Sequence, residues 1–200
     1  MSVLNIIKMG HPTLRKKAKK VLLKDFAKIK KLISDMKETL EFIGASGLAA
    51  PQVLENKRIV VYRVNKNRIP KSAKFKKIPW TVMINPIIKP LSSEKELYWE
   101  RCLSIPGLHG KVPRYRKISV EYYNLEKKII RHQAESTWAA LIQHECDHLD
   151  GILYPMRIKD FTKFGYNDTP GDIQSDMKHN KDSIDPLFLE LVKQWPAKNN

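Results

Sequence analysis

The chain has 200 residues, of which 42% are hydrophobic, and its formal net charge at pH 7 is +16. This size and composition fit a single soluble domain over 1–200 with a sizeable core, and no apolar run approaches the roughly 20 residues of a membrane span. Residues 1–8 lack the apolar core and the cleavage site of a secretory signal. Two cysteines make no disulfide framework, so we expect a reducing, cytoplasmic setting.

The excess of positive charge has two interpretations. Lysine-rich runs such as 15–20 and 74–77 are typical of a well-solvated surface, but they would also attract a polyanion. No sequence-reading nucleic-acid motif accompanies them. Composition alone leaves both interpretations open.

The first predicted element is an amphipathic helix over 25–43, because its apolar residues recur at three- and four-residue steps until Gly44. Asn85-Pro86 marks a break between two predicted strands. Asn124 begins the turn of a predicted hairpin. Segments rich in β-branched or extended-type residues are the predicted strands: 58–64, 81–84, 87–89, 97–101, 118–123 and 128–131.

A second helix is predicted over 136–150, with Ser136 or Thr137 as its cap and Gly151 after its end. The mixture of elements predicts an α+β fold, in which antiparallel sheets pack around this helix.

The C-terminal part of the chain is more polar. Residues 160–182 are predicted to be loop, and a last helix is predicted from Asp185-Pro186 to Trp195. We expect its apolar face to pack on the body of the domain. The core is therefore expected in about 1–160, followed by a polar loop and a C-terminal helix in 161–200.

The second helix contains the most informative motif, H-E-C-D-H at 144–148. Residues four apart on a helix differ by roughly 40° in azimuth, so His144 and His148 emerge from one face and can share a metal ion. Glu145 lies beside that face, where it can accept a proton from an activated water molecule. Cys146 lies about 200° around the helix from His144 and is expected in the core.

A catalytic site of this kind needs a third protein ligand. Metzincin proteases would use a histidine where this chain has Tyr154. Thermolysin-type proteases use a downstream glutamate, and none occurs between Glu145 and Glu190. Upstream, Cys102 in E-R-C-L-S offers a thiolate, which is a strong, soft metal ligand.

Three blocks, in this order, resemble the peptide deformylase family: G-L-A-A-P-Q at 47–52, E-R-C-L-S at 100–104 and H-E-C-D-H at 144–148. The resemblance extends from about residue 9 to 160. It implies the same α+β architecture and removal of the formyl group from N-formylmethionyl nascent peptides. It also implies that Cys102, His144 and His148 hold one divalent metal, Fe2+ in the cell, with Zn2+, Ni2+ or Co2+ compatible with the same ligands.

The resemblance further implies a role for several side chains. Glu145 would carry the proton, while the side-chain amide of Gln52 and the backbone N–H of Leu103 would stabilise the oxyanion. Substrate would lie as an added strand along the segment that holds Ser46 and Gly47. Glu100 would shape the methionine pocket or, alternatively, would be a surface carboxylate paired with a lysine.

Two positions depart from the family pattern. Arg101 stands where glycine is usual before the cysteine, and Ala45 stands at the first glycine of G-x-G. A side chain at Arg101 could point outward or could narrow the cleft, and the second arrangement would restrict the range of substrates. The stretch between Gln52 and Cys102 looks longer than in compact members, with 65–80 as the expected insertion.

The same resemblance implies a partner for the basic surface, because deformylases act on chains leaving the ribosome. Ribosomal RNA is therefore the implied polyanion, and the C-terminal helix is a second possible contact. Two other functions stay open. One is a metallopeptidase that cuts internal peptide bonds, and the other is a catalytically impaired relative that binds RNA or the ribosome.

Overall fold

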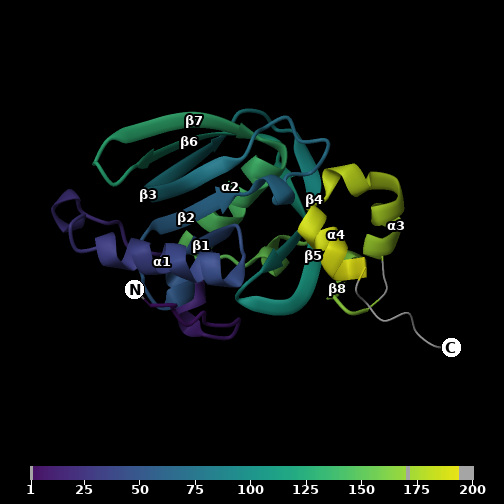
Figure 1. Ribbon diagram of the computed structural model, residues 1–200, viewed down its shortest axis with the longest axis horizontal. Coiled ribbons are helices and arrows are strands. Elements are labelled where there is room, and N and C mark those ends of the chain that lie inside the picture. Colours follow the sequence, from purple (N-terminus) through teal and green to yellow (C-terminus); the bar gives the residue numbers. More distant parts are fainter. Residues whose placement is uncertain (1, 170–171, 194–200) are drawn as a thin grey trace.

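The larger layer of the fold is a five-stranded antiparallel sheet, seen in the computed structural model, which describes residues 2–169 and 172–193 (Figure 1). Its strand order is β1-β2-β3-β6-β7, so β1 is an edge strand that pairs only with β2. The bounds are β1 Gly47–Ala49, β2 Ile59–Val64, β3 Ile78–Pro90, β6 Lys117–Tyr123 and β7 Ile129–Glu135.

A second antiparallel sheet has three strands in the order β4-β5-β8, so β4 is also an edge strand. The pairing of β4 with β5 shifts in register between Glu100 and Cys102. This irregularity lies at the residues that lead into the predicted metal site. The bounds are β4 Lys95–Cys102, β5 Ile105–Tyr115 and β8 Phe164–Tyr166.

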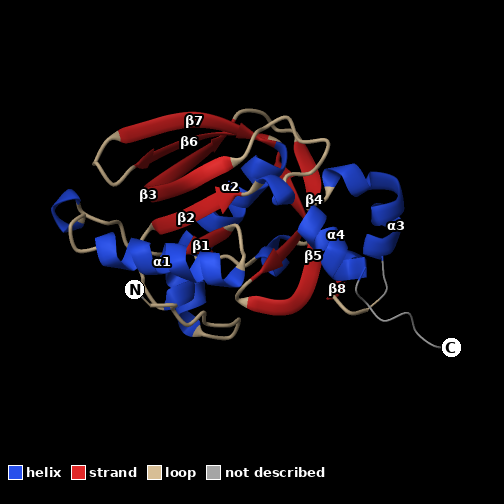
Figure 2. Cartoon of the chain, viewed as in Figure 1, coloured by secondary structure: helices blue, strands red, loops and turns tan. Residues whose placement is uncertain are grey.

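Helix α2, Ser136–Leu149, lies between the two sheets and contacts strands of both (Figures 1 and 2). Ala139, Ile142 and Leu149 are fully buried in a cluster with residues of β2, β3 and β6. Cys146 belongs to the same cluster, which confirms its expected place in the core. Because α2 is enclosed on nearly every side, its polar motif is held inside the protein rather than on a surface.

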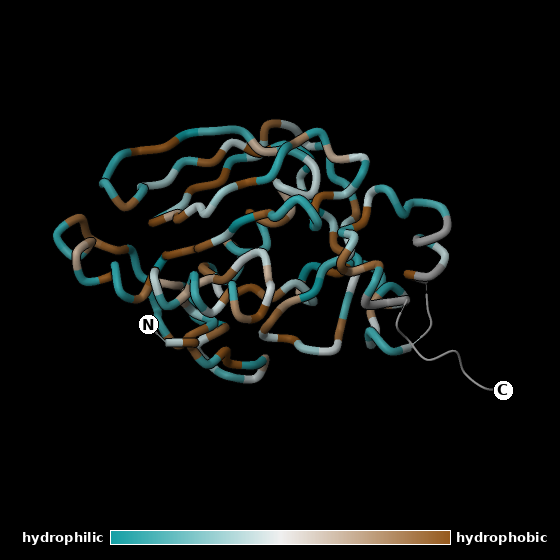
Figure 3. The backbone as a smooth tube through the Cα atoms, in the orientation of Figure 1, coloured by the Kyte–Doolittle hydropathy of each residue, from teal (hydrophilic) through white to brown (hydrophobic). Residues whose placement is uncertain are grey.

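Helix α1, Lys30–Ile43, covers the opposite face of the larger sheet. Its buried Met36 and Leu40 pack in one cluster with Ile59 and Val61 of β2. Val60 instead points toward α2, because successive strand residues face opposite sides. A strand covered on both faces explains the continuous apolar run of β2, which is visible as brown stretches in Figure 3.

The C-terminal helices α3, Asp172–Asn180, and α4, Pro186–Lys193, lie at one end of the molecule beside β4 and β5 (Figure 1). Phe188 and Ile184 form a small buried cluster with Ile173. The packing expected for the last helix is confirmed at Phe188, while Trp195 lies outside the described residues. Short 3₁₀ helices complete the described chain: Pro12–Arg15, Leu23–Asp25, Ala50–Val53, Lys66–Arg68, Tyr154–Arg157, Phe161–Lys163 and Lys181–Ser183.

The structure corrects several predicted boundaries. The first helix begins at Lys30 rather than at residue 25, because the preceding apolar residues pack from a 3₁₀ helix and turns. The break at Asn85-Pro86 is a register shift inside one long strand, β3. There Asn85 has φ of 54° and exchanges two hydrogen bonds with the backbone of Val21.

Two other predictions are wrong. Neither Ser136 nor Thr137 caps α2, since the chain passes directly from β7 into the helix with Ser136 at φ 56° and no side-chain cap at Glu135. The predicted loop over 160–182 contains β8 and α3. Within 2–169 and 172–193, no helix has the length and hydropathy of a membrane-spanning segment.

Candidate metal centre

Cys102, His144 and His148 converge although they come from two distant elements. Cys102 ends β4, and the two histidines lie one turn apart on α2. The Cys102 Sγ atom is 3.3 Å from His148 Nε2, and the ligand atoms of all three residues lie within 4.8 Å of one another. Ligand atoms about 2.0–2.3 Å from a tetrahedral ion are separated by roughly 3.3–3.7 Å, so Cys102 and His148 already have the spacing of two ligands on one ion. His144 lies close enough to supply the third, and a tetrahedral site of three protein ligands keeps one position for a small molecule.

Glu100 orients the first histidine. Its Oε2 atom lies 2.7 Å from His144 Nδ1, which leaves Nε2 of that ring for a metal. Burial would raise the pKa of Glu100, but the guanidinium of Arg114 and the ring of His144 outweigh burial and bring this pKa to about 2. Glu100 is 8% exposed, so the alternative of a surface carboxylate paired with lysine is wrong.

Arg114 on β5 joins the metal centre to the rest of the fold. It donates two hydrogen bonds to Glu100, at 2.6 and 2.9 Å, and one to Asp147, at 2.5 Å. Arg157 donates two more to Asp147. Arg114 is only 2% exposed, and sequence reasoning missed it. The available signal was its spacing: Arg114 follows the apolar Val112 by two residues, so the two side chains lie on the same face of a strand.

Glu145 faces the backbone of β1. A Cβ atom added to Gly47 would lie 2.2 Å from Glu145 Oε1, so no larger residue fits there without displacing the carboxylate. The Oε2 atom is buried and has no hydrogen-bond partner among the described residues. Burial raises the pKa of Glu145 to about 7.

Gln52 is held with its amide nitrogen toward the metal centre. Its Oε1 atom accepts a hydrogen bond from the Ala49 N–H at 2.9 Å, which fixes the orientation of the amide. Its Nε2 atom donates to Ser104 Oγ at 3.2 Å and lies 3.6 Å from Cys102 Sγ. Ser104 is fully buried. Sequence reasoning did not identify Ser104 as a hydrogen-bond partner of Gln52, although Ser104 lies within the cysteine motif.

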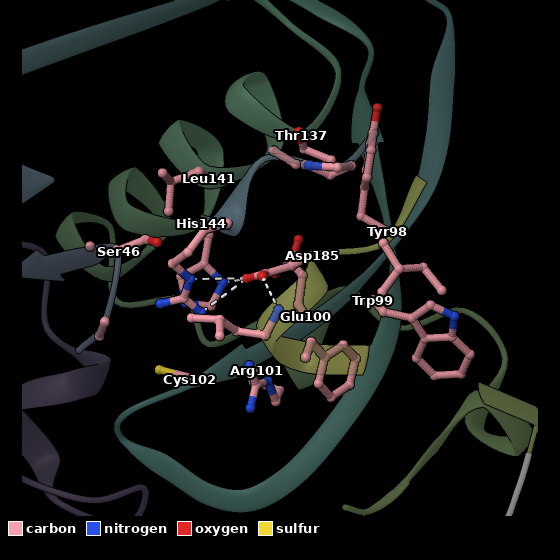
Figure 4. Close-up of a pocket in the computed structure, with 18 of the residues that line it drawn as sticks. Ser46, Tyr98, Trp99, Glu100, Arg101, Cys102, Thr137, Leu141, His144 and Asp185 are labelled. Carbon is pink, nitrogen blue, oxygen red and sulfur yellow. Dashed lines mark hydrogen bonds and ion pairs between the residues drawn. The ribbon is translucent and has the colours of Figure 1, made fainter. Parts of the chain in front are cut away.

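A cavity of about 910 Å³ opens beside these residues (Figure 4). It lies between the two unpaired strand edges, β1 on one side and β4 on the other. Of the predicted site residues only His148 does not line the cavity, because it lies deeper. Those that do are Ser46, Gly47, Gln52, Glu100, Cys102, Leu103, His144 and Glu145.

One end of the cavity is bounded by the C-terminal segment and by the segment after β2. Arg68 donates one hydrogen bond to the Gly44 carbonyl, at 2.9 Å, and two to Asp185. The Arg101 guanidinium lies over the ring of Phe188, 4.3 Å from its centroid. Arg101, Asp185 and Cys102 all line the cavity, and Figure 4 labels the three side chains.

Comparison with known proteins agrees with this geometry. The sequence profile of the family described as "Polypeptide deformylase" matches residues 3–164. A peptide deformylase 1 of Bordetella pertussis is 45% identical over 164 residues, which are 82% of this chain and 92% of its own. A peptide deformylase 1 of Nitrosomonas europaea is 40% identical over 173 residues, which are 86% of this chain and 97% of its own.

Solved structures give the same result. The K2U-bound class I type b peptide deformylase of Acinetobacter baumannii has a TM-score of 0.74 and 32% identity, and the match covers 79% of this chain and all of that one. The peptide deformylase of Thermotoga maritima has a TM-score of 0.70 and 34% identity, with 79% and 99% covered. Fold, metal-binding triad and sequence therefore lead to one conclusion: the chain belongs to the polypeptide deformylase family.

Proposed function

We propose that this deformylase acts on formyl-methionyl chains through a centre in which Glu145 moves the proton and Gln52 and Leu103 bind the developing oxyanion. The observation that carries the proposal is the juxtaposition of a Cys102–His144–His148 triad, within 4.8 Å, with a buried carboxylate oxygen that has no partner among the described residues. The reaction is hydrolysis of the formyl amide to formate and a free α-amine.

The metal is proposed to be Fe2+ in the cell, because the family resemblance favours it. One thiolate and two imidazoles also suit zinc, nickel and cobalt. When bound, the ion would lower the pKa of a water ligand to about 7 and polarise the formyl oxygen. The thiolate of Cys102 makes the centre sensitive to oxidation.

Glu145 is proposed as the general base and then the general acid. It would accept the proton of the attacking water and deliver it to the departing amine, and one carboxylate can do both because the steps are sequential. Two features support this role. The carboxylate is enclosed, and burial raises its pKa to about 7, close to the value at which a group exchanges protons efficiently near neutral pH.

Two donors are proposed for the negative charge that develops on the formyl oxygen. The Gln52 amide is already oriented by the Ala49 N–H, so little reorganisation is needed when the charge appears. The backbone N–H of Leu103 is the second proposed donor, beside Cys102. Loss of one such donor costs on the order of 10²–10³ in turnover.

The peptide is proposed to lie as an extended strand in the cavity between β1 and β4. Both strands have an unpaired edge, and an extended chain can add to such an edge through main-chain hydrogen bonds. Gly47, at the start of β1, and Ser46, just before it, border this path. Glu100 is proposed to act mainly through His144, because its carboxylate is occupied by that ring and by Arg114.

A cytoplasmic location and a ribosomal partner complete the proposal. The net charge of +16 would attract ribosomal RNA, and the lysines at 16–17 and 19–20 are exposed. Binding there would bring the enzyme close to emerging chains.

The test is release of formate from formyl-methionyl peptides by anaerobically purified protein, paired with metal analysis. We expect the Glu145→Ala variant to keep one metal per chain and to lose turnover by about 10²–10⁴-fold. Glu126→Ala, in the exposed turn between β6 and β7, is the matched control and should retain full activity. Unchanged turnover in Glu145→Ala would eliminate the proposed mechanism.

A further inference from the structure

Arg101 places a cation in the active-site cavity with no anion bound to it among the described residues. Its side chain lines the cavity and packs over the ring of Phe188. No hydrogen bond or ion pair joins its guanidinium to any other residue within the part of the chain that the structure describes. Arginine stays charged at neutral pH, so this charge lies partly desolvated and unpaired.

The carboxylate of Asp185, which attracts Arg101, is already bound to another residue. Asp185 attracts Arg101 electrostatically, but its Oδ2 atom accepts hydrogen bonds from Arg68 at 2.9 and 3.1 Å. This corner of the cavity therefore holds two guanidinium groups and one carboxylate, and its net charge is positive. The aromatic ring offsets only part of the cost of desolvating Arg101.

The place of Arg101 on β4 decides which part of a substrate it meets. Its neighbours Glu100 and Cys102 face the metal centre, where the formyl group must lie. The Arg101 guanidinium instead lies over the ring of Phe188, 4.3 Å from its centroid, so the side chain is directed toward α4. A peptide that extends along β4 would reach it with a residue beyond the formyl-methionine.

We propose that Arg101 is a specificity-determining residue, which binds a carboxylate on one of the two residues that follow the formyl-methionine. The proposal rests on the extended substrate path proposed above. Carboxylates match the planar guanidinium and form strong, charge-assisted hydrogen bonds with it. The enzyme should thus prefer chains that carry aspartate or glutamate directly after the methionine or one residue later.

The subsite uses features beyond the common family pattern. Phe188 and Asp185 lie after residue 164, where the family match ends. Arg101 itself replaces the glycine that is usual before the motif cysteine. The preference is therefore a property of this chain rather than of the metal centre.

Two sets of C-terminally amidated peptides test the proposal: formyl-Met-Xaa-Ala and formyl-Met-Ala-Xaa, with Xaa as aspartate, asparagine or lysine. Amidation removes the terminal carboxylate, so that only Xaa changes the charge. At one of the two positions we expect kcat/KM for aspartate to exceed that for asparagine by about tenfold. Lysine should be the poorest of the three, because of like-charge repulsion.

Arg101→Met removes the charge but keeps an unbranched apolar stem against Phe188. We expect the aspartate-to-asparagine ratio to fall to about one in this variant and to be partly retained in Arg101→Lys. Arg131→Met removes the same charge from an exposed site on β7, where the side chain of Arg131 is 70% exposed. It should leave the ratio as it is in the parent enzyme.

Equal kcat/KM for aspartate and asparagine at both positions would overturn the proposal. So would an unchanged ratio in Arg101→Met, because the residue would then only pack against α4. Absence of formate from every peptide, including the asparagine forms, would instead contradict the proposed function.

Discussion

Gly47 is required by the side chain that it faces. The family resemblance implies that substrate lies along this segment, but the Glu145 carboxylate already approaches it, because a Cβ atom at Gly47 would lie 2.2 Å from Glu145 Oε1. The absence of a side chain at Gly47 therefore leaves room for the Glu145 carboxylate.

We expect Gly47→Ala to displace the Glu145 carboxylate and to lower formate release by about 10²-fold or more, while the triad keeps its metal. Gly165→Ala on β8 is the control, because a Cβ atom there meets nothing within 4 Å. Turnover and metal content are measured for both variants. Normal turnover in Gly47→Ala would show that Glu145 need not lie where it does.

Tyr62 gives a pH dependence that can be measured. It is 1% exposed, and burial raises the pKa of its phenol above the usual value. The folded protein therefore favours the neutral phenol, and this stabilisation is full below pH of about 10 and lost as the pH rises above it. We expect the free energy of unfolding to fall less steeply above pH 10 in Tyr62→Phe than in the parent.

Urea unfolding at a series of alkaline pH values measures this slope. Tyr166→Phe, at an exposed site on β8, controls for the loss of any phenol. Identical slopes in Tyr62→Phe and in the parent would refute the role of burial.

At the scale of elements, one guanidinium connects β4, β5 and α2. Arg114 bonds Glu100 and Asp147 at once, and its removal would leave Glu100 buried without a guanidinium partner and Asp147 with Arg157 alone. The position of the metal ligands thus depends on a residue that does not line the cavity.

Arg114→Met should lower the free energy of unfolding by about 3–5 kcal/mol, since breaking a buried ion pair leaves an uncompensated charge. Arg131→Met breaks a pair with Glu121 whose two side chains are both exposed, and it should cost about 1 kcal/mol or less. Denaturant melts of the two variants make the comparison. Equal losses would mean that the buried network contributes little.

The elements that could be predicted are those with a local signal. The periodicity of α1 and the β-branched run of β2 depend on neighbouring residues, and both elements were predicted. Strand β5 carries two prolines and two glycines and is held by its partner β4, so local preference did not reveal it. Helix α3 is polar and packs through Ile173, which explains why it was predicted to be loop.

The same distinction applies to the site. The metal ligands could be predicted because two histidines four residues apart on a helix can bind one ion, and the cysteine block offers the third ligand that such a site needs. Arg114 and Ser104 were missed, since their importance arises from contacts with residues far along the chain. Long-range pairing of this kind leaves no periodic pattern in a single sequence.

At the scale of the whole molecule, charge is the dominant surface property. The net charge of +16 is spread over many exposed lysines, and the proposed ribosomal partner is a polyanion. We expect the enzyme to sediment with ribosomes at about 50 mM salt and to be released steeply by 200 mM salt, because counterion release governs such binding.

Reversal of the charge on the exposed lysines at 16, 17, 19 and 20 should weaken this sedimentation without changing formate release from short peptides. Arg131→Glu, a single reversal on β7, is a control for a general change in charge. Sedimentation that is absent at low salt would contradict the proposed partner and leave the chemistry of the centre untouched.

The central claim is that Cys102, His144 and His148 bind one metal ion together. X-ray absorption of the metal-loaded protein tests it most directly. For zinc, the account predicts one sulfur at about 2.3 Å and two imidazole nitrogens at about 2.0–2.1 Å, with the sulfur shell lost in Cys102→Ser. A first shell without sulfur in the parent protein, or a spectrum unchanged by Cys102→Ser, would contradict it.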